Sequence, residues 1–81
     1  MKIELYKSAL CPRCAYAAYV LNKLQSCVDD VEILTYDITT DFSAFKDKKI
    51  KMIPSIVCGD NQKSWLLPKE AEIRDFILEN R

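Results

Sequence analysis

The chain has 81 residues, 49% of them hydrophobic, and its 12 basic side chains balance 12 acidic ones. This length predicts one domain, residues 1–81, with its own core, and the zero net charge gives no indication of binding to nucleic acid or anionic membranes. The sequence contains no histidine, which excludes an imidazole base, a cysteine–histidine nucleophile pair and a histidine-bearing zinc site.

The first half of the chain predicts two strands, each followed by a helix. Residues 2–7 alternate between polar and apolar side chains and predict a strand, whereas residues 12–26 carry apolar side chains at helical spacing. Residues 31–38 are rich in β-branched and aromatic side chains and predict a second strand. A short helix is expected over residues 41–48.

The second half predicts a hairpin and a last helix. Residues 53–58 predict a third strand, residues 59–62 a turn, and residues 63–67 a fourth strand that returns beside the third. Pro68 fits the first turn of the last helix, because its missing N–H would have no partner there. The expected buried face of that helix comprises Ile73, Phe76 and Ile77.

The predicted order of elements is β-α-β-α-β-β-α. A strand–helix–strand crossover favours parallel pairing of the first two strands, and a hairpin supplies antiparallel pairing. We therefore expect an α/β fold with a four-stranded mixed sheet flanked by three helices.

Two cysteines stand at the start of the first predicted helix. With Cys11 as the N-cap and Pro12 as the first helical residue, the free amides of the first turn point towards the Cys11 sulfur. The positive end of the helix dipole and the charge of Arg13 favour a thiolate there. We therefore predict a lowered pKa for Cys11 and a role as nucleophile.

Cys14 follows three positions later, on the same side of the helix, within reach of a disulfide with Cys11. We expect it to be the more buried thiol, to keep its proton longer and to resolve a mixed disulfide on Cys11. A structural disulfide would close a loop of four residues and add about 2 kcal/mol to the free energy of unfolding. A reducing cytosol would remove such a disulfide. A metal site would need further ligands, and the other two cysteines are isolated in sequence. A redox pair is the favoured interpretation.

The segments "LYKSALCPRC" and "MIPSIV" resemble the active-site loop and the proline turn of the glutaredoxin/thioredoxin-like family, and the resemblance covers nearly the whole chain. It implies a thioredoxin-like fold of the glutaredoxin type and a cis peptide bond between Ile53 and Pro54, where a substrate strand pairs with the backbone. The residues expected to bind substrate are Pro12, Arg13, Ile53, Pro54, Lys7 and Lys51.

The resemblance implies a dithiol–disulfide reductase that acts on protein or low-molecular-weight disulfides. Two electron donors stay open: glutathione as a co-substrate, or a dedicated reductase. The alternative function is a metal-binding or iron–sulfur carrier module that uses the thiolates of Cys11 and Cys14. We expect no tightly bound cofactor and a monomer. Because the sequence has no long apolar run and no signal-peptide core, we expect a cytoplasmic protein.

The remaining cysteines and the single tryptophan have structural interpretations. Cys27 ends the first predicted helix and Cys58 ends the third strand. Because cysteine behaves as a small hydrophobic residue, both are expected to fill the core. Trp65 lies on the predicted fourth strand, where a core or edge-covering role is expected.

Overall fold

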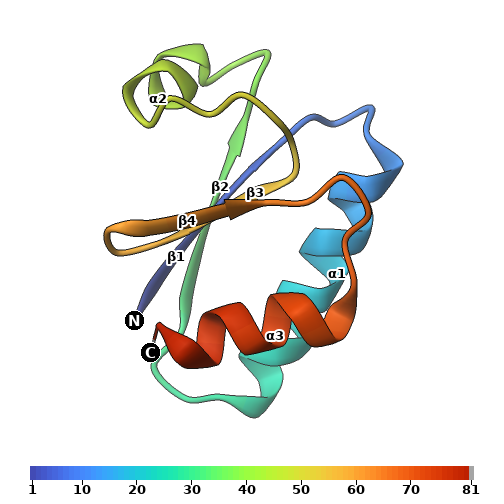
Figure 1. Ribbon diagram of the computed structural model, residues 1–81, viewed down its shortest axis with the longest axis vertical. Coiled ribbons are helices and arrows are strands. Elements are labelled where there is room, and N and C mark those ends of the chain that lie inside the picture. The colour runs from blue at the N-terminus through green and yellow to red at the C-terminus, as the bar shows by residue number, and fades with distance from the viewer. Residues whose placement is uncertain (81) are drawn as a thin grey trace.

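A computed structural model describes residues 1–80 of the chain (Figure 1). The predicted order of elements is confirmed. The elements are β1 (Lys2–Lys7), α1 (Pro12–Cys27), β2 (Glu32–Asp37), α2 (Phe42–Asp47), β3 (Ser55–Cys58), β4 (Asn61–Ser64) and α3 (Glu70–Glu79). None of the helices in this part of the chain is long and apolar enough to cross a membrane.

The strands form one mixed sheet in the order β2-β1-β3-β4. β1 runs parallel to β2 and antiparallel to β3, and β3 and β4 form the antiparallel hairpin. Helices α1 and α3 cover one face of the sheet and α2 covers the other (Figure 1). The predicted four-stranded mixed sheet with three flanking helices is therefore confirmed.

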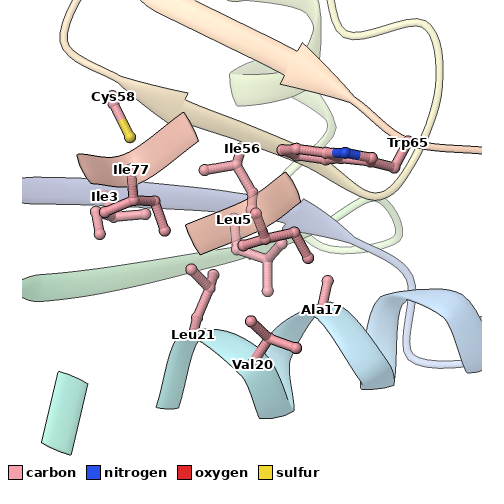
Figure 2. Packing of buried hydrophobic residues seen from close by; sticks show 10 residues of the cluster. Ile3, Leu5, Ala17, Val20, Leu21, Ile56, Cys58, Trp65 and Ile77 are labelled. Carbon is pink, nitrogen blue, oxygen red and sulfur yellow. The ribbon is translucent and has the colours of Figure 1, made fainter. Parts of the chain in front are cut away.

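The alternation of β1 divides its side chains between the two faces of the sheet. Ile3 and Leu5 are buried in the larger cluster, which α1 and α3 complete, whereas Tyr6 lies in the smaller cluster with Phe45 of α2. Figure 2 shows the larger cluster, in which side chains of α1 such as Leu21 point towards the sheet. Burying each large apolar side chain contributes about 1.5–3 kcal/mol, so this cluster fixes α1, and with it Cys11, against the sheet.

The hairpin differs from its prediction in length and register. Cys58 pairs with Asn61, which leaves only Gly59 and Asp60 as the turn, and the last pair joins Ser55 to Ser64. Gly59 has φ of 62°, a left-handed conformation that glycine adopts without steric cost. The predicted turn over residues 59–62 and strand over residues 63–67 are therefore wrong. Because β3 begins at Ser55, β4 has no strand to pair with beyond Ser64.

The segment between β4 and α3 is a loop instead of the end of a strand. Trp65 turns into the core and is 4% exposed, while Leu66 and Leu67 are 66% and 71% exposed. Pro68 precedes the helix rather than lying in its first turn, since Lys69 is extended and α3 begins at Glu70. The predicted position of Pro68 is thus wrong by two residues.

The two remaining cysteines have opposite environments. Cys58 is buried in the larger cluster, as predicted, and Trp65 joins it there. Cys27 is exposed, so its predicted core position is wrong. The buried positions of α1 are Cys14, Ala17, Val20 and Leu21, and Cys27 lies beyond this buried stretch at the last residue of the helix.

Candidate active site

Cys11 lies between the end of β1 and the start of α1. It is the N-cap residue of the helix, with an extended backbone (φ −104°, ψ 111°), and Pro12 follows in the first turn. Its Sγ accepts a hydrogen bond from the backbone N–H of Cys14 at 3.2 Å. An N-cap side chain satisfies a first-turn amide that would otherwise have no partner in the helix, so the helix itself holds the sulfur in place.

The surroundings of Cys11 favour the thiolate. Burial disfavours ionisation, but hydrogen bonds from the Cys14 thiol and amide, together with the charge and amide of Arg13, outweigh it and lower the pKa of Cys11. The thiolate is the reactive form of cysteine, so a lowered pKa increases its fraction at neutral pH. The surroundings of Cys11 thus act in the direction predicted from the sequence.

Cys14 has the opposite chemistry. It is completely buried, and desolvation, the hydrogen bond to Cys11 and the nearby charge of Cys11 raise the pKa of its thiol to about 11. Both thiols are free, and Cys11 is the accessible one. The pair therefore combines an accessible thiol of lowered pKa with a buried thiol of raised pKa one helical turn further in.

Arg13 joins the start of α1 to the loop before α3. Its Nη1 donates to the carbonyl oxygen of Leu66 at 2.8 Å, across 53 positions of sequence, and Figure 1 shows the loop passing beside the first turn of α1. Beside this contact lies a shallow groove of about 330 Å³. The residues that line it are Pro12, Arg13, Tyr16, Leu67 and Pro68.

The peptide bond between Ile53 and Pro54 is cis, as the resemblance implied. Pro54 is buried directly before β3. Because Ser55 pairs with Tyr6, Pro54 lies at the end of the sheet where β1 leads into the Cys11 loop. The carbonyl oxygen of Pro54 accepts a hydrogen bond from the N–H of Trp65 at 3.1 Å. Its role in substrate binding stays a prediction.

The two lysines predicted to bind substrate belong to different segments of the chain. Lys7 ends β1, paired with Asp37 of β2. Hydrogen bonds from Thr39 lower the pKa of Asp37, and the charge of Lys7 acts in the same direction. Lys51 is exposed in the loop that leads to the cis peptide bond. Both roles stay predictions.

Leu66 and Leu67 were given no role by the sequence beyond strand formation. The only signal was their position, as two adjacent leucines followed by a proline, and a strand explained it equally well.

Among residues 1–80, no group of three or more cysteine, aspartate or glutamate side chains is arranged to hold a metal ion. Cys11 and Cys14 together would supply two sulfur ligands.

The sequence matches no protein-family model and no curated protein sequence. Solved structures nevertheless share its architecture. Thioredoxin of Fasciola hepatica superposes with a TM-score of 0.84, covering 99% of this chain and 80% of that one at 15% identity. Mitochondrial thioredoxin 3 of Saccharomyces cerevisiae, in its oxidised form, superposes with a TM-score of 0.81. The match covers 96% of this chain and 76% of that one at 16% identity.

A mutant thioredoxin of Halobacterium salinarum gives a TM-score of 0.82, covering 98% of this chain and 73% of that one at 15% identity. The chain has a thioredoxin-like fold. This confirms the expected fold class. At these identities the likeness concerns the fold, so the activity has to be argued from the cysteine pair.

Proposed function

We propose that the protein is a thiol–disulfide oxidoreductase in which Cys11 is the nucleophile and Cys14 the resolving thiol. The observation that carries this proposal is the Cys11 sulfur at the N-cap of α1, 3.2 Å from the Cys14 amide, with Cys14 buried behind it. The thioredoxin-like fold supports the same reaction class.

The first step is attack of the Cys11 thiolate on one sulfur of a substrate disulfide. A bond forms between Cys11 and that sulfur while the substrate S–S bond breaks, and the second substrate sulfur leaves as a thiolate. The amide of Cys14 donates to the Cys11 sulfur, and the charge of Arg13 lies beside it. Both favour the thiolate before attack.

The second step frees the substrate. Cys14 gives up its proton to the departing thiolate or to water, and its sulfur attacks the Cys11 sulfur. The Cys11–Cys14 disulfide forms as the mixed disulfide breaks. The substrate gains two electrons and the protein loses two, so an external thiol donor must reduce the pair before another turnover.

We further propose a cytoplasmic monomer of the dithiol glutaredoxin or thioredoxin type, with either glutathione or a dedicated reductase as donor. Ile53, Pro54, Lys7 and Lys51 belong to the proposed substrate site. Turnover of a glutathione mixed disulfide, compared with insulin reduction by a thioredoxin reductase, distinguishes the two donors. Absence of turnover with glutathione would exclude the first.

Cysteine variants test the roles of the two thiols. Cys14→Ser should accumulate a mixed disulfide between Cys11 and the substrate, measured by mass spectrometry of the intact adduct. Cys11→Ser should abolish disulfide reduction, whereas Cys27→Ser, at the other end of α1, serves as the matched control and should keep it. A Cys11→Ser protein that reduces disulfides at the normal rate contradicts the proposal.

The pKa of Cys11 offers an independent measurement. The rate at which iodoacetamide alkylates Cys11 is measured at a series of pH values, with peptide mapping to identify the modified residue. The dependence of this rate on pH should give an apparent pKa below that of free cysteine. Cys14→Ala removes the thiol hydrogen bond to Cys11 and should move this pKa upwards. A Cys11 that titrates like free cysteine in both proteins would remove the basis of the proposed attack.

A further inference from the structure

We propose that Arg13 is a specificity-determining residue that binds a carboxylate of a polypeptide substrate, close to the half-cystine that Cys11 attacks. The inference rests on the proposed function and deepens it. It assigns a preference for disulfides flanked by aspartate or glutamate to the groove lined by Pro12 and Arg13, the two residues that follow Cys11.

The charge of Arg13 has no carboxylate partner within the described chain. The ion pairs found among residues 1–80 join Lys23 to Glu70 and Arg74 to Asp75. The guanidinium carries five N–H donors, and its recorded hydrogen bond goes to the neutral carbonyl of Leu66. Because that bond fixes the planar group without neutralising it, the other donors are preorganised for an oxygen acceptor, and carboxylates bind such a group bidentately.

The position of Arg13 ties this charge to the reacting sulfur. Arg13 is two residues from Cys11 on the first turn of α1, and it lines the same groove as Pro12. Because Pro12 directly follows Cys11, we expect a substrate chain bonded to Cys11 to extend its neighbouring side chains over this groove. A carboxylate in the first or second position from that cysteine comes within reach of the guanidinium.

The apolar surroundings favour a polypeptide over a small polar disulfide. The groove also has Tyr16, Leu67 and Pro68 in its walls, and Leu66 and Leu67 project from the loop with more than half of their surface exposed. A peptide chain covers these side chains while it presents its carboxylate. A small disulfide such as oxidised glutathione has carboxylates but little apolar surface to cover the leucines.

Three disulfide-linked peptides test the inference, identical except for glutamate, glutamine or lysine beside the reacting cysteine. For the unchanged protein, kcat/KM should be about two- to fivefold higher for the glutamate than for the glutamine peptide, the range for a partly exposed ion pair. The lysine peptide should be slower still. The preference should shrink in high salt.

Arg13→Gln should bring the glutamate-to-glutamine ratio to one. A ratio is the right readout because the charge of Arg13 also lowers the pKa of Cys11, and that effect cancels between two peptides attacked by the same thiolate. Arg13→Lys should restore part of the preference. Lys2→Gln removes the same charge from the start of β1, at the opposite end of the strand from the Cys11 loop, and should leave the ratio as it is.

The outcomes separate this inference from the function beneath it. Reduction of all three peptides at equal rates overturns the role of Arg13 and leaves the oxidoreductase in place. Reduction of none overturns the proposed function itself, and the inference with it. For each substrate, the loss of kcat/KM caused by Arg13→Gln is compared with the loss for the glutamine peptide. If the extra loss for oxidised glutathione equals that for the glutamate peptide, Arg13 recognises the carboxylate on small disulfides too. The assignment to polypeptides is then wrong.

Discussion

Cys11 and Cys14 show how strongly local surroundings divide two identical side chains. They are three positions apart at the N-terminus of α1, yet the pKa of Cys11 is lowered and that of Cys14 is raised to about 11. Desolvation acts against the thiolate in both. At Cys11 the hydrogen bonds from the Cys14 thiol and amide outweigh desolvation, whereas at Cys14 desolvation and the bond to Cys11 outweigh the backbone hydrogen bond from Ser8.

Lys49 allows a test of backbone conformation at a single residue. It follows α2 with φ of 56°, and the N–H of the next residue, Ile50, donates to the carbonyl of Phe45 at 2.9 Å. A left-handed conformation costs a non-glycine residue about 1–2 kcal/mol, and part of this is offset by the larger entropy loss of glycine. Lys49→Gly should therefore raise the free energy of unfolding by about 0.5–1 kcal/mol, measured by urea denaturation.

Lys48→Gly is the matched control, because it removes the same charge one residue earlier. Lys48 has φ of −90°, which a lysine adopts without strain. Its replacement should lower the free energy of unfolding by about 0.5–1 kcal/mol, the ordinary cost of glycine flexibility. If both variants destabilise the protein to the same extent, the conformation of Lys49 carries no strain.

At the scale of elements, α1 is the helix that joins the candidate site to the core. Leu21 is 1% exposed in the larger cluster, whereas Leu24, one turn later, is only partly buried. Leu21→Ala should lower the free energy of unfolding by about 3 kcal/mol, through lost transfer energy and the cavity left behind, and Leu24→Ala by about 1 kcal/mol. Urea unfolding of both variants measures the difference, and equal losses would contradict the difference in burial between Leu21 and Leu24.

The order of elements could be predicted because each is encoded locally by periodicity and by turn residues. The hairpin register could not, because the length of β4 depends on where β3 begins, and that depends on the buried Pro54. The exposure of Cys27 was missed for a similar reason. Apolar spacing defines the face of a helix but not the point at which the helix leaves the sheet it packs against.

The candidate site was predictable in its centre and not at its edge. Cys11, Pro12 and Cys14 are neighbours in sequence, so helix geometry alone places the sulfur near the first-turn amides. The contact between Arg13 and Leu66 spans 53 positions. It depends on the path of the loop after β4, which no local pattern encodes.

For the molecule as a whole, two hydrogen bonds link the parts of the candidate site. The carbonyl of Leu66 accepts from Arg13, and the N–H of Trp65 donates to the carbonyl of Pro54. One loop thereby connects the start of α1 with the cis peptide before β3. Trp65 anchors the loop in the core, 4% exposed, so that the following leucines project beside the groove. The fold brings together three segments that are distant in sequence at one end of the sheet.

The buried thiols predict how global stability depends on pH. Burial raises the pKa of Cys58 from 9.0 to about 11, so the unfolded chain releases this proton at lower pH than the folded protein does. The contribution of Cys58 to stability is full below pH 9 and is lost as pH rises through 11, and two pKa units correspond to about 2–3 kcal/mol. Cys14 titrates in the same direction and adds to the loss.

Cys58→Ala isolates this effect, because every other group titrates alike in the two proteins. The variant should be the less stable at pH 8, where the deleted sulfur leaves a small cavity. Between pH 8 and 11 the unchanged protein should lose about 2–3 kcal/mol more than the variant, measured by urea denaturation under a phosphine reductant that keeps all thiols reduced. Parallel stability curves over that range would mean that the Cys58 thiol ionises equally readily in the folded and unfolded chains, and that its burial against α1 and α3 does not hold its proton.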